Sequence, residues 1–338
     1  MGKKQTYCIA VANQKGGVSK TTSTSCLGYV LGKLGFKVLL IDCDSQASLT
    51  QLSGVYPSDF NVDDEEVYGL QDIYEYALEC EDKREEYSWE AIKAAIIEPK
   101  YREAVRIKEN DEYKVDWEYH EFGYSMIPSD AGLANYEQFL SQRKNGGLIM
   151  WKIMQVIKEY GGYDFCILDC APSLSTVTYG ALAAATDGII IPVNNEPMSL
   201  RGTRNIISAI AEIQTLMSGI EKDGKKIVHK GILGLLKTQY AKRFRIQRDF
   251  DEVIKDFMPI KAFNTSIPSL TACDKAHAKG WLFAQYDHRA FEVYKELCDE
   301  IIKKLEKQKN LKDPVIVESI GAEAERALAT AKEVDDDE

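Results

Sequence analysis

The sequence lacks the marks of a membrane protein and of a disulfide-bonded secreted protein. No apolar run reaches the roughly 18 residues that a membrane span needs, and the longest candidate, residues 180–193, contains Asp187. The N-terminus carries Lys3 and Lys4 but no long apolar stretch of the secretory kind. The 8 Cys occur without a CxxC pair, which favours reduced thiols. We therefore expect a cytoplasmic chain with no membrane partner.

Negative charge is concentrated in two segments of the chain. The chain of 338 residues is 45% apolar, as a globular protein is, and has a net charge of −11. Residues 55–122 hold 21 acidic and 8 basic side chains, and residues 311–338 hold 9 and 3. The rest is mildly basic, so the net charge does not exclude a nucleic-acid partner. We expect one domain over 1–310 with an acidic, Tyr-rich insertion at 55–122, followed by an acidic tail at 311–338.

The apolar pattern predicts an α/β fold. Short apolar runs predict buried strands at 6–12, 37–41, 124–128, 165–168, 188–193 and 232–236. Helical patterns lie at 21–34, 148–160 and 289–308, and two more within the insertion at 70–78 and 89–97. Strand, helix and strand in succession indicate a mostly parallel sheet flanked by helices, a Rossmann-like three-layer arrangement. The apolar face of 289–308 is expected to pack on the sheet; membrane-surface binding is the alternative, which the acidic end disfavours.

The strongest motif is a glycine-rich loop between the first predicted strand and helix. Its residues are Lys15, Gly16, Gly17, Val18, Ser19, Lys20, Thr21 and Thr22. Glycines let backbone N–H groups approach a phosphate, and the helix that follows adds its positive N-terminal end. Lys20 is placed to reach the β- and γ-phosphates, and the Thr21 hydroxyl to reach Mg²⁺. The loop therefore predicts a P-loop site for a nucleotide.

The loop departs from the strict GxxxxGK[ST] pattern at two positions and contains a further lysine. Gln14 and Ser19 occupy the two outer glycine positions, and Lys15 is an additional lysine. A lysine at the start of the loop cannot easily serve the phosphates that Lys20 already serves. It can serve those of a neighbouring subunit.

Residues 15–22 resemble the deviant Walker A loop of the ParA/MinD-type ATPases. Four more segments resemble this family: 38–50, 165–174, 189–202 and 263–287. The resemblance spans 5–54 and 124–305 and favours the ParA branch. It implies a P-loop NTPase fold, Mg²⁺-dependent ATP hydrolysis that is slow, and a homodimer in which Lys15 crosses to the partner's nucleotide.

The resemblance also assigns roles to three acids that follow predicted strands. Asp42 and Asp44 close the second strand and Asp169 a later one, so all three should point toward the loop. By similarity, Asp44 positions the attacking water, Asp42 supports the metal shell and Asp169 holds Mg²⁺ through water. With Lys15 and Lys20, Asp44 completes the expected catalytic set. A simple strand-end cap is the alternative for Asp42.

Two departures from the family bear on activity. Ser19 stands where the family has Gly, and if that position needs a positive φ, Ser costs about 1 kcal/mol. Ser45 replaces a usual Pro. We expect lower nucleotide affinity or turnover.

Matching of segments places Thr238 and Pro268 near the adenine. A basic cluster follows the predicted strand at 232–236: Lys242, Arg243, Arg245 and Arg248. It suits non-specific contact with DNA phosphates, and Arg243 falls where related ParA proteins carry a DNA-binding arginine. Another such arginine is absent, because Ser269 and Ala272 stand there. A solvated helix face is the alternative.

The expected function is an ATP-dependent dimerisation switch that binds DNA at the nucleoid and segregates a plasmid, chromosome or mobile element. A ParB-like partner would stimulate hydrolysis, and the acidic insertion suits docking of a basic peptide unless it is a solvated decoration. Three rivals stay open. They are a MinD-like membrane-associated ATPase, an iron–sulfur reductase using Cys170, and an interaction protein with a degenerate loop.

Overall fold

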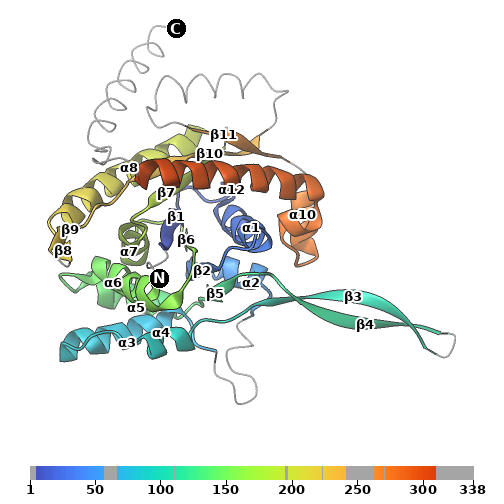
Figure 1. Ribbon diagram of the computed structural model, residues 1–338, viewed down its shortest axis with the longest axis horizontal. Helices are drawn as coiled ribbons and strands as arrows, with labels where there is room; N and C mark the ends of the chain where they lie inside the picture. Colours follow the sequence, from blue (N-terminus) through green and yellow to red (C-terminus); the bar gives the residue numbers. More distant parts are fainter. Residues whose placement is uncertain are drawn as a thin grey trace, which may run out of the picture.

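A parallel seven-stranded sheet forms the centre of the computed structural model, in the order β11-β10-β7-β1-β6-β2-β5 (Figure 1). The structure describes residues 5–56, 67–109, 112–194, 197–222, 224–240, 262–269 and 271–309. The strands are β1 (Tyr7–Val11), β2 (Val38–Cys43), β5 (Ser125–Ile127), β6 (Phe165–Cys170), β7 (Gly188–Val193), β10 (Ile232–Tyr240) and β11 (Ala262–Pro268). Four of the five inner strands, β1, β2, β6 and β7, are almost wholly buried. This explains their continuous apolar runs, because helices cover both faces.

Helices cover the two faces of the sheet unequally. One face carries α1 (Lys20–Lys33), α2 (Ser48–Leu52), α10 (Thr271–Ala278), α11 (Phe283–Tyr286) and α12 (His288–Lys309). The other carries α3 (Leu70–Lys83), α4 (Trp89–Ala94), α5 (Leu133–Ser141), α6 (Ile149–Val156), α7 (Thr176–Ala184) and α8 (Pro197–Ser218). A 3₁₀ turn (Gly146–Leu148) precedes α6, a π turn (Ile157–Gly161) follows it, and a small ribbon joins β8 (Glu221–Lys222) and β9 (Lys225–Lys226). The predicted α/β three-layer fold is confirmed.

The C-terminal amphipathic helix packs as its pattern predicts. Tyr294, Leu297 and Ile301 of α12 are fully buried in the core that α12 shares with α1 and the sheet. Within the described residues, no helix combines the length and apolarity that a membrane crossing requires.

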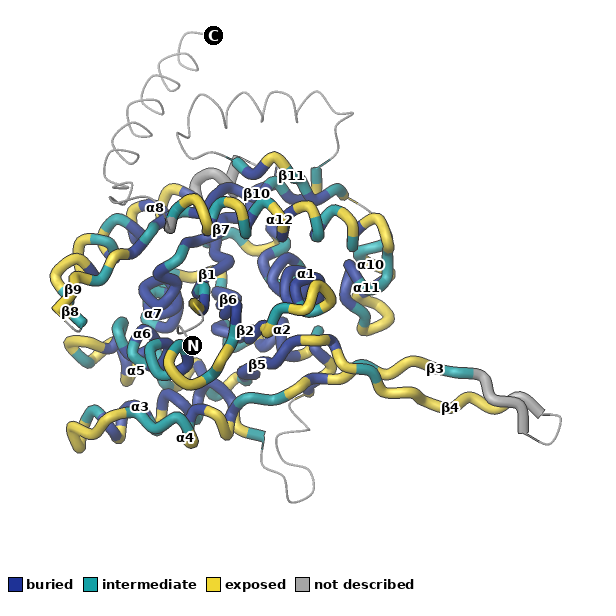
Figure 2. The backbone as a smooth tube through the Cα atoms, in the orientation of Figure 1, coloured by how far each residue is buried: buried dark blue, intermediate teal, exposed yellow. Residues whose placement is uncertain are grey.

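The described residues of 55–122, a region that we expected to be one acidic insertion, form two parts. Helix α3 is part of the body, because Leu70, Ile73 and Tyr74 are buried in the core beneath it. The second part is an antiparallel hairpin of β3 (Lys100–Glu109) and β4 (Glu112–Glu121). Figures 1 and 2 show it extending away from the body with most of its residues exposed. The appended element is thus the hairpin.

A buried histidine joins the start of β10 to the end of α7. His229 is 3% exposed, and its Nε2 lies 2.8 Å from the Leu182 carbonyl oxygen. Its Nδ1 accepts a hydrogen bond from the Gly231 amide at 3.1 Å, so the proton of the neutral ring sits on Nε2. Burial lowers the pKa of His229 below its ordinary value of 6.5, although the bond to Leu182 and the charge of Asp187 act in the other direction and Lys158 adds to the lowering.

We predict that His229 makes the fold sensitive to acid. Because its pKa is lowered in the folded state, the unfolded chain takes up the proton first, and the stability that it contributes is lost as pH falls through about 6.5. Urea unfolding at pH 7.5 and 5.5 measures this loss. In His229→Gln the difference in unfolding free energy between the two pH values should be smaller than in the parent. An equal difference in both proteins would contradict the prediction.

Candidate nucleotide-binding site

The glycine-rich loop lies between β1 and α1, at the carboxyl edge of the sheet. β1 has β6 on one side and β7 on the other, so the loop sits where the chain order of the sheet reverses. Gly17 and Ser19 both adopt positive φ, 74° and 61°. The Ser19 side chain does not cap α1, so the first N–H groups of the helix keep the arrangement that binds an anion.

Lys20 lies over this loop. Its Nζ donates a hydrogen bond to the Lys15 carbonyl oxygen at 3.1 Å, and the side chain is only 8% exposed. Burial lowers the pKa of Lys20, while Asp169, Cys170 and Asp44 raise it. The structure therefore brings the predicted phosphate lysine and two of the predicted acids into one electrostatic environment.

Asn13 fixes the beginning of the loop. It is fully buried, and its Nδ2 donates to the Pro192 carbonyl at 2.7 Å and to the Thr203 hydroxyl at 3.3 Å. Its Oδ1 accepts from the Lys15 amide at 3.1 Å. Gly202 of α8 packs directly on this corner, because a Cβ there would lie 2.5 Å from Asn13 Oδ1. The loop is thus joined to the end of β7 and to α8.

The end of β10 fixes the other side of the loop. Thr238 is 1% exposed, and its hydroxyl lies 3.2 Å from the carbonyl oxygens of Val18 and Val193. The side-chain amide of Gln239 donates to the Gly17 carbonyl at 2.8 Å and to the Ser19 hydroxyl at 3.3 Å. The hydroxyl of Thr238 is thus engaged with the loop itself, and its contact with the adenine stays a prediction.

Pro268, the other residue predicted near the adenine, ends β11. It pairs with Tyr240 at the carboxyl edge of the sheet, one residue beyond Gln239. Its place on the same edge as the loop is compatible with the predicted contact, which stays a prediction.

Two buried acids face each other across neighbouring strands. The register pairs Asp42 of β2 with Asp169 of β6, and both are at most 1% exposed. Burial raises the pKa of Asp169, as does the charge of Asp42, while the hydroxyls of Thr21 and Thr24 and the charge of Lys20 lower it. The Thr24 hydroxyl donates to Asp169 Oδ1 at 3.0 Å.

Asp42 is held by α2. Its Oδ2 accepts from the Thr50 amide at 2.9 Å and from the Thr50 hydroxyl at 2.7 Å, and its Oδ1 from the Asp44 amide at 3.2 Å. Burial nevertheless raises the pKa of Asp42 to about 6. Asp44 is half-buried, and its carboxylate accepts from the Gln46 amide at 3.0 Å.

The oxygen donors here fit Mg²⁺. The Thr21 hydroxyl and the carboxylate of Asp169 lie beside the loop, and Mg²⁺ binds through few protein oxygens plus water and phosphate. Asp42 directs both oxygens to protein donors, which suits a supporting role behind the metal. When bound, Mg²⁺ would neutralise charge on the phosphates.

Several residues of this site were not predicted from the sequence. Asn13, Thr24, Thr50 and Gln239 hold the loop or the carboxylates through hydrogen bonds. Thr24 had a readable signal, because it lies four residues after Lys20 and so on the same face of α1. Gln239 had none, since its partner is more than two hundred residues away in the chain.

The predicted DNA contacts Lys242, Arg243, Arg245 and Arg248 lie outside the described residues. The segment that contains them begins directly after β10, whose Thr238 and Gln239 contact the loop. Cys170, proposed for the iron–sulfur alternative, is 1% exposed in β6 and pairs with Cys43. All eight cysteines are free, and such a buried thiol does not suit a cluster shared at a subunit axis.

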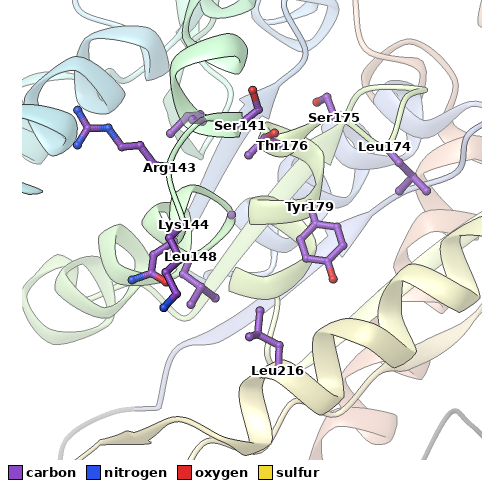
Figure 3. A pocket seen from close by; sticks show the side chains of 12 residues that line it. Ser141, Arg143, Lys144, Leu148, Leu174, Ser175, Thr176, Tyr179 and Leu216 are labelled. Carbon is purple, nitrogen blue, oxygen red and sulfur yellow. The ribbon is translucent and has the colours of Figure 1, made fainter.

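A cavity of about 320 Å³ lies elsewhere, between α5, α7 and α8 (Figure 3). Tyr179 and Leu216 approach it from two helices, and Lys144 borders it. No residue of the glycine-rich loop lines it, so it is separate from the candidate site.

Sheet, loop and paired carboxylates together define a P-loop nucleotide-binding protein. A family model described as an AAA domain matches residues 6–222. The chain is 27% identical over 295 residues to the sporulation initiation inhibitor protein Soj of Bacillus subtilis, covering 87% of this chain and 97% of that protein. It is 23% identical over 296 residues to the chromosome partitioning protein ParA of Caulobacter vibrioides, covering 87% and 93%.

Solved structures share the fold. Cobyrinic acid a,c-diamide synthase of Mycobacterium smegmatis, with an ATP analogue and magnesium, has a TM-score of 0.65 at 24% identity, covering 91% of this chain and 98% of that one. MinD of Pyrococcus horikoshii with Mg-ADP has a TM-score of 0.59 at 18% identity, covering 90% and 100%. The chain therefore belongs to the AAA domain family whose family model it matches. Its relatives Soj and ParA identify it as a ParA-type ATPase.

We predict that Ser19→Gly stabilises the protein. The left-handed conformation of Ser19 costs about 1 kcal/mol that Gly would not pay, and the weak bond from Gln239 offsets only part of this. The free energy of unfolding should rise by up to about 1 kcal/mol in urea titrations. The matched control is Ser48→Gly, at an exposed helical position with ordinary φ, which should lose stability. Equal losses in both variants would refute the strain at Ser19.

We also predict that the Thr50 hydroxyl stabilises the folded protein through its bond to the buried carboxylate of Asp42. Thr50→Val keeps the shape but removes the hydroxyl that donates to Asp42 and accepts from the Ser129 amide. Asp42 loses one of its donors and the buried Ser129 amide loses its acceptor, at a cost of about 1–3 kcal/mol in unfolding free energy. Thr215→Val, an exposed change on α8, should stay within about 0.5 kcal/mol of the parent. Similar values for both variants would contradict the assignment.

Proposed function

We propose that this protein is an ATP-dependent dimerisation switch that binds DNA and partitions a plasmid, chromosome or mobile element. The observation that carries the proposal is the pair of lysines in one loop. Lys20 already lies over the loop, and Lys15 stands at the start of the loop, a position from which a lysine can serve the nucleotide of a second subunit. The names of the relatives Soj and ParA support the partition role, whereas the likeness to MinD concerns the fold alone.

In the proposed reaction the chain hydrolyses ATP to ADP and phosphate. Backbone N–H groups from Gly16 to Thr22 bind the phosphates, and Lys20 contacts the β- and γ-phosphate oxygens. Thr21 and Asp169 hold Mg²⁺, with Asp42 behind them. Asp44 orients the attacking water, and Thr238 and Pro268 border the base. The solved neighbours with bound ATP analogue and magnesium support this choice of cofactors.

Hydrolysis is slow in this proposal because one cation is missing from each isolated subunit. Lys15 stabilises charge on the transferring phosphoryl group of its partner, and it does so only in the dimer. ATP therefore closes the homodimer, and hydrolysis limits its lifetime. The closed dimer doubles the basic cluster Lys242, Arg243, Arg245 and Arg248, which strengthens non-specific binding to DNA phosphates at the nucleoid. A ParB-like centromere-binding partner in the cytoplasm stimulates hydrolysis, and release from DNA follows.

Lys15 and Asp44 variants test this proposal. With ATP, the parent should dimerise and bind DNA, and neither should occur with ADP or without nucleotide. Lys15→Ala should lose ATP-dependent dimerisation and DNA binding, because the cross-subunit contact is gone. Asp44→Ala should keep both and lose turnover, because only the water-positioning group is removed. Sedimentation, DNA mobility shifts and phosphate release measure the three properties.

Lys37→Ala is the matched control, because Lys37 is exposed just before β2, outside the loop. It should behave as the parent in all three assays. If Lys15→Ala also behaved as the parent, the proposed exchange of lysines between subunits would be refuted.

A further inference from the structure

The β3–β4 hairpin stands apart from the rest of the molecule and has no role in the proposed ATPase cycle. It forms a two-stranded sheet of its own, and Figure 2 shows its described residues extending away from the body. An isolated hairpin is only marginally stable in water, so a long one that persists needs an anchor.

Aromatic packing at the root supplies this anchor. The Tyr101 ring lies 5.0 Å from Phe122, 5.3 Å from His120 and 6.5 Å from Trp281. Phe122 is fully buried and stacks on Tyr124, next to β5. The root is thus fixed to the body, and the hairpin presents its faces in a defined direction.

One face of the hairpin is apolar and basic. The register pairs Arg102 with Tyr119 and Ala104 with Trp117, so these four side chains share one face, as does Val115 two residues before Trp117. Val115, Trp117 and Tyr119 are 63%, 47% and 69% exposed. The Arg102 guanidinium lies 4.6 Å from the centre of the Trp117 ring. Large exposed apolar side chains gathered on one face are typical of a binding surface.

The opposite face is acidic. Glu103 pairs with Glu118, and Asp116 lies on the same side together with Lys114, so the acids outnumber the lysine there. His120 lies 3.7 Å from both glutamates. The aromatic and acidic residues that we expected to form one docking face for a basic peptide are therefore separated by the thickness of the hairpin.

We propose that the face formed by Arg102, Ala104, Val115, Trp117 and Tyr119 is a docking surface for an acidic segment of a partner protein that also carries apolar side chains. Trp, Tyr and Arg are the residues that dominate binding energy at protein interfaces. Glu121 lies opposite Lys100 on this face and offsets its charge, so the positive charge beside the aromatic side chains is that of Arg102, which complements a carboxylate of the partner. A partner that covers only this face leaves Glu103, Asp116 and Glu118 in solvent.

Duplex DNA is also acidic, but the second face disfavours it. A β-ribbon can enter the major groove, which is about 8.5 Å deep. A ribbon with side chains on both faces is about 10 Å thick, so the carboxylates of the outer face would lie level with the phosphates. Carboxylates and phosphates at the same level lie within a Debye length, about 8 Å, of each other, so salt does little to screen their repulsion. An acidic protein segment avoids this repulsion.

The surface can be tested without the ATPase reaction. The probes are a fluorescent peptide of alternating Glu and Leu, its Lys-for-Glu counterpart, and a fluorescent DNA duplex. Each is titrated with the full chain in the absence of nucleotide and followed by anisotropy. The double variant Trp117→Ala/Tyr119→Ala removes the aromatic surface, and Arg102→Glu reverses its charge. Glu103→Gln/Glu118→Gln is the matched control on the opposite face. Circular dichroism and ATP binding of each variant report on folding.

The acidic peptide should bind the parent, and its Kd should rise about tenfold or more in the two variants of the aromatic face, as for central interface residues. It should not weaken in the control on the opposite face. Three results would overturn the proposal: no binding of the acidic peptide, unchanged binding by the aromatic-face variants, or equal or tighter binding of the Lys peptide or the duplex through the same residues. Because no nucleotide is present, failure here leaves the proposed ATPase function untouched.

Discussion

The structure depends on a short backbone turn at the end of β1, which must hold its N–H groups ready for phosphate. Two residues of this turn have positive φ, and one of them, Ser19, is not glycine. A turn of this kind persists only when its surroundings fix it. Asn13 fixes one side through β7 and α8, and Thr238 and Gln239 fix the other from the end of β10. The carboxyl edge of the parallel sheet is what brings these distant residues together.

These contacts link the nucleotide loop to two other parts of the chain. Gly202 lets α8 pack against Asn13, so a displacement of the loop would also displace the first turns of that helix. Gln239 is the next-to-last residue of β10, and the basic segment predicted to bind DNA follows directly. The buried pair Asp42 and Asp169 adds the electrostatic part, since both carboxylates are desolvated and Asp169 interacts with Lys20.

The features that could be predicted from the sequence are those that local pattern and spacing determine. The apolar runs at β1, β2, β6 and β7 indicated buried parallel strands, and the strand-end positions of Asp42 and Asp169 indicated that both would point toward the loop; the structure adds that they pair with each other. The sequence also indicated the condition under which Ser19 would be strained, a positive φ, and the φ of 61° fulfils it. It could not predict Gln239 or Thr50, because their partners are chosen by tertiary packing. In the region 55–122, composition suggested one acidic surface, whereas the alternation of strand residues separates Trp117 and Tyr119 from Asp116 and Glu118. That alternation was readable, but only once these residues were known to form a strand.

The central claim is that Lys15 acts on the nucleotide of the other subunit, and mixing two inactive variants tests it most directly. Lys15→Ala retains Asp44 but offers no lysine, and Asp44→Ala offers the lysine but cannot position water. In a mixed dimer the lysine of the second protein completes the site of the first. The account predicts that each protein alone releases no phosphate from ATP and that the mixture does. A mixture as inactive as its components would contradict it.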